Sequence, residues 1–223
     1  MKLTAISAFS LLIAAGFGGA ASAAPAYTFT SAPTSEDTQL SLGFTFTANQ
    51  NLTVSSLGYF DDGGDGFLTA HEVGIYAGDG GDGPSSLLAS TTLGAGQSGA
   101  LGANDFRYQS IAPLALVAGQ TYTITGLSPN TDGLNDPWAY GGPNEVTGFA
   151  VDPAISIGLN AARYTYNPGG LVDPSSHYSD YRFYAVNFAA GVPEPATWAV
   201  MLFGVAAAGA ALRAGRRAPI AIT

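Results

Sequence analysis

Between residues 24 and 191, clusters of glycine, proline and polar residues interrupt the chain at intervals of about eight to twelve residues. This spacing leaves room for one short strand between interruptions, and no long stretch with a 3.6-residue hydrophobic period replaces it. Such spacing is typical of β-sandwiches and barrels. It predicts an all-β fold, in the form of an antiparallel, jelly-roll-like β-sandwich.

Strand positions follow from the alternation of apolar and polar residues. Over residues 40–47, leucine and phenylalanine alternate with serine, glycine and threonine, which is the pattern of a half-buried strand. Threonine and β-branched isoleucine at 122–125 also favour a pleated surface. The further predicted strands cover residues 52–59, 72–76, 87–93, 106–111, 121–125, 148–151, 162–166 and 182–188.

The N-terminus has the three regions of a secretory signal peptide. Lys2 precedes an apolar run that is followed by small residues, and Ala21 and Ala23 fit a cleavage site. We therefore assign residues 1–23 to a signal peptide, with an uncleaved N-terminal membrane helix as the alternative. The exported β-sandwich domain then comprises residues 24–191.

The C-terminal segment 192–217 combines a Pro-Glu-Pro triplet, an apolar span and an arginine cluster. The two prolines hold the triplet extended, because proline fixes φ and has no N–H. Residues 196–212 carry no charge and, at 17 residues, are near the lower limit of about 17–25 for a single transmembrane helix. The arginines that follow place the C-terminus in the cytoplasm and the domain outside it. The motif residues are Pro193, Glu194, Pro195, Arg213, Arg216 and Arg217.

These three parts, with Trp198 at the outer edge of the span, resemble the PEP-CTERM sorting tail. The resemblance implies that an exosortase-type membrane protease recognises the segment. It also implies export through the inner membrane with transient anchoring there, and then a location at the cell surface or outside the cell. A plain C-terminal membrane anchor and an amphipathic surface helix are alternatives, but neither accounts for the Pro-Glu-Pro triplet.

A second resemblance rests on strand and turn residues of the exported region. The motifs that carry it are Val54–Asp61, His71–Tyr76, Leu87–Ser90, Phe106–Tyr108, Leu116–Tyr122 and Tyr184–Phe188. They resemble a family of uncharacterised bacterial β-sandwich domains over about residues 40–188. Because these motifs consist mostly of strand and turn residues, the resemblance implies a fold and leaves the activity open.

The exported region is strongly acidic and contains no cysteine. It holds three arginines, no lysine and 15 carboxylates, which give it a net charge of −12. Since nucleic-acid binding depends on neutralising phosphates with lysine and arginine, we predict no nucleic-acid partner. Cations and neutral glycans are the expected partners. Without cysteine, the exported fold must be stabilised by packing and not by disulfides.

The acidic segment 61–72 is the candidate metal site. Carboxylates occupy EF-hand loop positions 1, 5 and 12, but Gly63 stands at position 3 and the flanks are strands, which excludes an EF-hand. A Ca²⁺ site of another kind is one interpretation, because Ca²⁺ relieves repulsion between neighbouring carboxylates. A solvated hairpin loop is the other. The candidate ligands are Asp61, Asp62, Asp65 and Glu72, and Ca²⁺ is the one cofactor that the sequence suggests.

Trp138 and Tyr140 are the candidate glycan-binding residues. They lie in the turn-rich segment 135–142, where a large ring is not expected in the core. Aromatic rings offer sugars a flat apolar face, and the asparagine and aspartate that precede Trp138 would supply polar groups. Tyr164 and Tyr166 alternate on one strand face and would extend this platform. The alternative is that these rings cap or fill the sandwich.

The sequence offers little for nucleophilic catalysis. His71 and His177 are its two histidines, and no G-x-S-x-G, H-E-x-x-H or cysteine nucleophile accompanies them. A pair of carboxylates could hydrolyse a glycoside, but the sequence does not select a pair. We therefore predict a non-catalytic protein of the cell envelope or extracellular (biofilm) matrix, associated with exopolysaccharide. A secreted carbohydrate-active hydrolase that uses a carboxylate pair is the alternative.

The sorting interpretation predicts the C-terminus of the mature protein. Mass spectrometry of the protein isolated from its own cells should find a chain that ends near residues 192–195, because exosortase recognition implies cleavage at the triplet. Recovery of a mature chain that still carries residues 213–223 would contradict the prediction.

Overall fold

The computed structural model describes residues 23–35, 39–79, 85–129, 134, 136–142, 144–158, 160–191 and 206. The chain divides into two compact units, Ala21–Pro193 and the two terminal segments together. The predicted signal peptide up to residue 22, the sorting residues and the span 196–212 lie outside the described residues, apart from the helical Ala206. Within the part that is described, no helix is long and apolar enough to cross a membrane.

The unit Ala21–Pro193 consists of β-strands and two single turns of 3-10 helix. The long strands are β4 (Leu40–Ala48), β5 (Leu52–Phe60), β6 (His71–Ala77), β7 (Ser86–Leu93), β9 (Phe106–Leu116), β10 (Thr121–Ser128), β14 (Ala162–Tyr166) and β17 (Val186–Gly191). The short elements are β1 (Ala24–Pro25), β2 (Tyr27–Thr28), β3 (Thr34–Ser35), η1 (Asp62–Gly64), β8 (Ala100–Leu101), η2 (Ala103–Asp105), β11 (Trp138–Gly141), β12 (Ala150–Val151), β13 (Ile155–Ser156), β15 (Ser176–Tyr178) and β16 (Arg182–Phe183).

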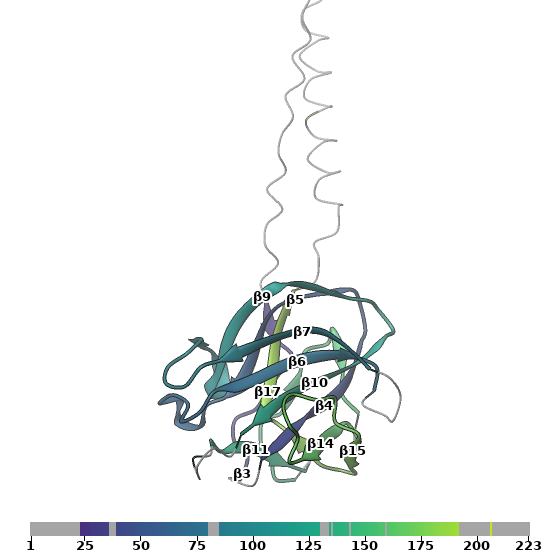
Figure 1. The fold of residues 1–223 in the computed structure, drawn as a ribbon. Coiled ribbons are helices and arrows are strands. Elements are labelled where there is room, and N and C mark those ends of the chain that lie inside the picture. The colour runs from purple at the N-terminus through teal and green to yellow at the C-terminus, as the bar shows by residue number, and fades with distance from the viewer. Residues whose placement is uncertain are drawn as a thin grey trace, which may run out of the picture. The chain divides into compact units, whose positions relative to one another are not determined.

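The strands form two large and two small sheets (Figure 1). The seven-stranded sheet has the order β15-β14-β4-β10-β6-β7, with β13 also paired to β4, and the five-stranded sheet has the order β1-β17-β5-β9-β8. The small sheets are β16-β11-β3 and β12-β2. All assigned pairs between the described strands are antiparallel. This confirms the prediction of an all-β, antiparallel fold.

The core lies between the two large sheets. Phe46 of β4 packs on Phe188 of β17 with ring centroids 4.8 Å apart, and both side chains are buried. Alternation along β4 directs Leu42, Phe44 and Phe46 into this core, as the sequence pattern indicates. Apolar burial of this kind provides most of the stabilisation in a domain without disulfides.

Several predicted strands needed correction. Residues 182–188 form two strands and not one, because the chain leaves the small sheet at Tyr184, whose N–H donates to the Ala139 carbonyl, and then joins the five-stranded sheet. Of residues 148–151 only β12 is a strand. β9 continues through Pro113 to Leu116, well beyond the predicted end at residue 111. β8 pairs only with the first residues of β9, so the missing proline N–H disrupts no ladder on that side.

The segment 138–141 is a strand, and Trp138 belongs to the core cluster with 6% of its surface exposed. The expectation that a large ring in this turn-rich segment lies outside the core was therefore wrong for Trp138. Pairing with β3 and β16 makes the segment a strand, although proline precedes it and glycine ends it. His177, one of the two histidines, lies on the short strand β15.

Gly126 provides a test of how closely the sheets approach. A Cβ atom at this position of β10 would lie 2.4 Å from Val186 Cγ1 and 2.9 Å from the Tyr59 ring, both across the core. We expect Gly126→Ala to destabilise the domain by roughly 2–3 kcal/mol through overpacking. Thermal unfolding of residues 21–193 measures this as a fall in Tm of roughly 5–10 °C.

Gly158→Ala is the matched control, because no atom lies within 4 Å of a Cβ built there. We expect its Tm to stay unchanged or to rise slightly. Equal melting temperatures for the two variants would contradict the close approach of the sheets at Gly126.

Candidate functional site

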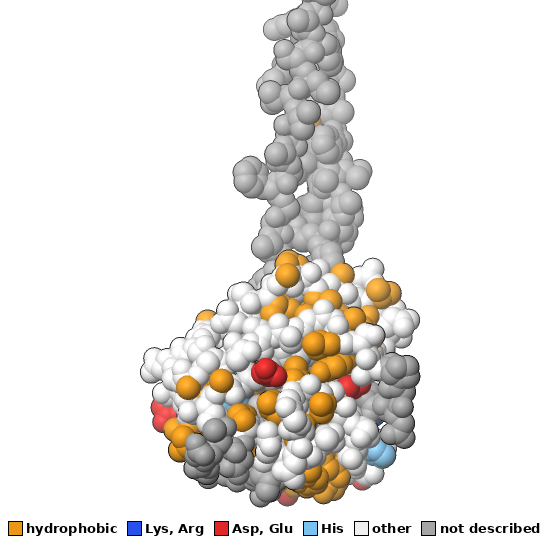
Figure 2. All heavy atoms as spheres, in the orientation of Figure 1, with side chains coloured by type: hydrophobic (Ala, Val, Ile, Leu, Met, Phe, Trp, Pro, Cys, Tyr) orange, Lys and Arg blue, Asp and Glu red, His pale blue; other side chains and the backbone are white. Residues whose placement is uncertain are grey.

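Nine residues line a cavity of about 400 Å³ at one end of the seven-stranded sheet. Seven of the nine carry aromatic rings, and we call this cavity the aromatic pocket. Its lining residues are Ser35, Leu40, Trp138, Tyr140, Tyr164, Tyr166, Tyr178, Tyr181 and Phe183. The four rings that sequence analysis assigned to glycan binding therefore border one cavity. Hydrophobic side chains are also visible at the lower end of the space-filling view, near β14 (Figure 2).

One wall of the aromatic pocket comes from the edge of the seven-stranded sheet. Tyr164 and Tyr166 are two residues apart on β14 and so lie on the same face, with ring centroids 5.3 Å apart. The register of β14 on β4 places Tyr166 opposite Leu40. Tyr178 reaches the same wall from β15 and stacks on Tyr164 at 5.0 Å.

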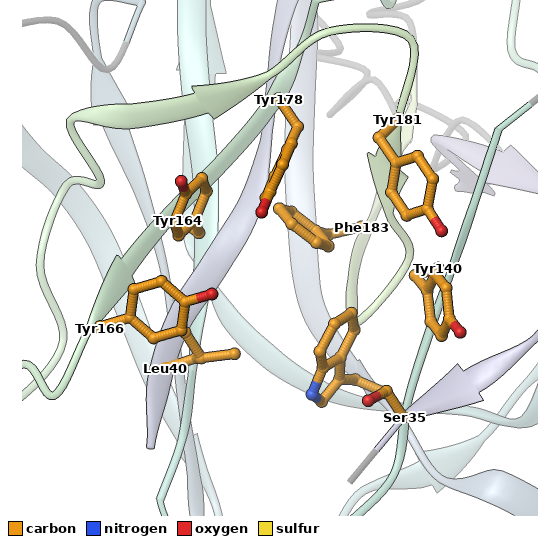
Figure 3. Close-up of a pocket in the computed structure, with 9 residues that line it drawn as sticks. Ser35, Leu40, Tyr140, Tyr164, Tyr166, Tyr178, Tyr181 and Phe183 are labelled. Carbon is orange, nitrogen blue, oxygen red and sulfur yellow. The ribbon is translucent and has the colours of Figure 1, made fainter. Parts of the chain in front are cut away.

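The opposite wall comes from the small sheet β16-β11-β3. The register of β11 sets Trp138 opposite Ser35 on β3 and Tyr140 opposite Phe183 on β16. Tyr181 precedes β16 and stacks on Tyr140 with a centroid distance of 5.6 Å. Figure 3 shows Tyr164 and Tyr166 on one side of the cavity, Tyr140 and Tyr181 on the other, and Phe183 between them.

The pocket has a buried floor and an open rim. Trp138, Phe183 and Leu40 are 6%, 5% and 4% exposed, so they are fixed by the core behind them. Tyr166 and Tyr178 are 56% and 46% exposed and stand at the mouth. A rigid apolar floor with accessible rings above it is an arrangement suited to a ligand with both apolar and polar faces.

The polar groups of the pocket are tyrosine hydroxyls, the Ser35 hydroxyl and one indole N–H. Burial, and then the neighbouring phenols of Tyr178 and Tyr166, raise the pKa of Tyr164, so this hydroxyl stays a neutral donor and acceptor. Among the described residues, the Nε1 of Trp138 is buried and has no hydrogen-bond partner. The accessible polar groups of the pocket are therefore the hydroxyls.

No charged side chain lines the aromatic pocket among the residues that the structure describes. A glycoside hydrolase requires two carboxyl groups that flank the scissile bond. The pocket therefore offers ring faces and neutral hydroxyls, which suit binding, and its described lining lacks the acid pair of a hydrolase.

The acidic loop after β5 is organised by an internal ion pair. The Arg107 Nε donates to the Asp61 carboxylate, and Arg107 Nη2 donates to the Gly64 carbonyl at 2.8 Å. The Gly66 N–H donates to both Asp61 oxygens at 3.1 Å. Asp61 is 3% and Arg107 4% exposed, so each buried charge compensates the other. The pair folds the loop back onto β9.

The structure brings three of the four predicted metal ligands to one cavity: Asp61, Asp62 and Asp65 border it together with Asp136, and Glu72 does not. Among the described residues, no group of three or more histidine, aspartate or glutamate side chains is placed to hold a metal ion. Asp61 is bound to Arg107, while Asp62, Asp65 and Glu72 are exposed.

A second buried pair joins His71 to Asp136. His71 Nε2 lies 2.9 Å from the Asp136 carboxylate, and Nδ1 lies 3.0 Å from the Leu127 carbonyl. The imidazole is fully buried and stacks on Tyr59 with a centroid distance of 3.8 Å. Both ring nitrogens face oxygen acceptors, so both can donate when the ring carries two protons. His71 is thus engaged within the core and not presented to a substrate.

Asp136 also fixes the segment before His71. Its carboxylate accepts hydrogen bonds from the N–H groups of Leu68 at 2.8 Å and Thr69 at 3.1 Å. Burial by itself raises the pKa of Asp136, but the hydrogen bonds from His71 and from these two amides outweigh it and hold the pKa below its ordinary value. Asp136 does not line the aromatic pocket, which corrects the expectation that it would supply a polar group there.

Five lining residues of the pocket were not among the predicted ones. They are Ser35, Leu40, Tyr178, Tyr181 and Phe183. The density of aromatic residues between 164 and 184 is the signal that could have identified the three rings. No pattern of the sequence indicates Ser35 or Leu40, because their positions depend on the pairing of β3 with β11 and of β4 with β14.

Comparison with known protein families gives one match. Residues 191–217 match the PEP-CTERM protein-sorting motif. This confirms the resemblance seen at the C-terminus, and the match spans the Pro-Glu-Pro triplet, the apolar span and the arginine cluster. Curated protein sequences gave no match to the chain.

Several solved chains are distantly similar, and two of them are structures of Cwp84. One holds the cysteine protease and lectin-like domains of Cwp84, a surface layer associated protein of Clostridium difficile, and the other is the clostridial cysteine protease Cwp84 after propeptide cleavage. Sequence identity is 9% and 10%, and each match covers 75% of this chain with a TM-score of 0.43. The match spans only 36% and 40% of those two chains. Likeness at this level assigns no activity.

The His71–Asp136 pair predicts a pH-dependent stability. We expect Asp136→Asn to destabilise residues 21–193 by roughly 2–4 kcal/mol at pH 7, because it removes the charge from a buried, hydrogen-bonded pair. The folded-state pKa of Asp136 is lowered from 3.8, so its contribution is present above that pH and is lost as the pH falls through the folded-state pKa. Urea unfolding at pH 7 and pH 3 measures the difference.

Asp105→Asn is the control, because Asp105 is exposed and asparagine tolerates its positive φ of 56°. This variant should keep the stability of the original protein at pH 7. A loss caused by Asp136→Asn that was as large at pH 3 as at pH 7 would contradict the role of the carboxylate charge.

Proposed function

We propose that this chain is a non-catalytic, glycan-binding protein of the cell envelope or extracellular matrix. It carries a PEP-CTERM motif, which is recognised by exosortase, a membrane protein, and implies sorting to an exported or surface location. Proteins sorted in this way are generally non-catalytic. The proposal goes beyond sorting in one respect: it names glycans as the class of ligand that the protein binds.

The aromatic pocket carries the proposal. Its volume of about 400 Å³ lies in the range of small-molecule sites, and rings with hydroxyl groups form most of its lining. Each sugar ring has apolar C–H faces that pack on aromatic rings and hydroxyl groups at its edge that exchange hydrogen bonds. The exposed rings of Tyr166 and Tyr178 at the mouth would let a polymer continue past the pocket.

On this proposal the glycan is an exopolysaccharide outside the cell. The exported region has a net charge of −12, which disfavours polyanions such as nucleic acid. Removal of residues 1–23 and cleavage near the Pro-Glu-Pro triplet would release the domain 24–191 into the compartment where such polymers occur. The compact unit Ala21–Pro193 has nearly these boundaries, which supports its independence from the terminal segments.

Removal of the rim rings tests the proposal. The double variant Tyr166→Ala with Tyr178→Ala should weaken association with the exopolysaccharide of the producing cells by roughly tenfold or more, because exposed aromatic contacts dominate such interfaces. Co-sedimentation of the mature protein with the purified polymer measures binding, and reducing-end assays on the same samples measure hydrolysis.

The double variant Leu87→Ala with Leu101→Ala is the matched control, since both leucines are about half exposed but lie outside the aromatic pocket. It should bind as the original protein does. Release of reducing ends by the original protein would favour a hydrolase, and unchanged binding by the tyrosine variant would refute the assignment of the pocket.

A further inference from the structure

The rings of the aromatic pocket face the cavity from several directions. Trp138 meets Phe183 at an interplanar angle of 78° with centroids 5.3 Å apart. On the opposite wall Tyr164 meets Tyr166 at 79° and 5.3 Å. Between the two walls, Phe183 meets Tyr164 at 75° and Tyr178 at 76° (Figure 3). A group that enters the cavity therefore meets rings in more than one orientation.

The charge near this pocket is negative. Glu145 accepts a hydrogen bond from the Gly142 N–H at 2.8 Å, close to the end of β11. A Cβ atom built at Gly142 would lie 3.6 Å from Glu145 Oε2 and 3.2 Å from the carbonyl of Asp180, the residue before Tyr181, so Glu145 lies near this side of the pocket. Burial, and then the carboxylate of Glu145, raise the pKa of Tyr181. The Glu145 side chain is exposed, so its charge is available to a ligand at the mouth.

No described cation offsets this negative charge in the pocket. Arg107 is committed to Asp61, and Arg163 donates to the backbone carbonyls of Asp79 and Asn160. The guanidinium of Arg182 lies 4.8 Å from the centre of the Phe149 ring, which is not a lining residue. The exported region contains no other arginine and no lysine.

We propose that the aromatic pocket selects a sugar unit that carries a protonated amino group. The inference rests on the proposed glycan binding and specifies its substrate class, an amino-sugar polymer with free amines. An ammonium group is attracted to aromatic faces, most strongly to those of tryptophan and tyrosine, and several faces line this cavity. Glu145 adds attraction for the same charge.

The tyrosine hydroxyls of the pocket favour a sugar over a bare ammonium ion. Sugar hydroxyls can exchange hydrogen bonds with these phenols, whereas a tetraalkylammonium ion has neither a donor nor an acceptor. N-acetylation would remove the positive charge from the amine, and a uronic acid would bring a carboxylate towards Glu145. Both changes should weaken binding.

Isothermal titration of the mature protein with three tetramers tests the inference. The probes are the β-1,4-linked glucosamine tetramer, its N-acetylated form and the corresponding glucose tetramer. At pH 6 we expect the glucosamine tetramer to bind roughly tenfold more tightly than the other two, in line with a cation–π contribution. The preference should disappear at pH 9, where the amine is neutral, while the raised pKa values of Tyr164 and Tyr181 keep those two hydroxyls protonated.

Two variants separate local charge from overall charge. Glu145→Gln keeps an acceptor for the Gly142 N–H and should reduce the preference for the glucosamine tetramer several-fold. Asp105→Asn removes the same unit of charge from an exposed site outside the pocket and should leave the preference unchanged. An equal effect of both variants would overturn the role assigned to Glu145.

The remaining outcomes distinguish this inference from the proposed function. Equal binding of the three tetramers, or binding of the exopolysaccharide but of no tetramer, would overturn the amine preference and leave glycan binding in place. Tetramethylammonium that bound as tightly as the glucosamine tetramer would overturn the requirement for a sugar. Failure of every glycan, the exopolysaccharide included, would overturn both proposals.

Discussion

Packing of aromatic rings between the two large sheets is the interaction on which the rest of the structure depends. Tyr27 lies within it: its ring meets Phe44 and Phe106 edge-on at 5.5 and 5.8 Å, and its hydroxyl donates to the Val186 carbonyl at 2.7 Å. Because the chain contains no cysteine, burial of these side chains must offset the conformational entropy of folding without a covalent bond. The buried pair of Asp61 and Arg107 contributes mainly by directing a loop, since desolvation cancels much of its attraction.

The aromatic pocket forms by the same packing of rings, at a place where the small sheet β16-β11-β3 takes the position of the second large sheet. Tyr164 and Tyr166 alternate along β14 as core residues do, but they face the short strands β11 and β16 and not the five-stranded sheet. Those strands bring Trp138 and Phe183 from the core side and leave a cavity between the layers. In a domain that is rich in aromatic residues, a cavity lined by rings can therefore form without polar catalytic groups. It is enough that the opposite layer covers the rings only in part.

The sequence predicted the parts of the fold that depend on local pattern. Strands β4, β5 and β6 lie where alternation indicated them, since the apolar residues that alternate along each of them are buried. β11 was missed because its strand character comes from pairing with β3 and β16, while proline and glycine at its ends favour a turn. The acidic loop was ambiguous for a related reason: its partner Arg107, 46 residues further along the chain, decides the role of Asp61.

The sequence predicted the aromatic character of the candidate site but not the full set of residues that line it. Trp138 and Tyr140 stood out because a β-sandwich gives large rings a place in the core or at a ligand, and a short segment among turns suggested the second. Trp138 combines both positions: it belongs to the core cluster and also lines the cavity. Burial in the core and a place in a cavity wall are therefore not alternatives for an aromatic residue at the edge of a sheet, because different parts of one large ring contact different neighbours.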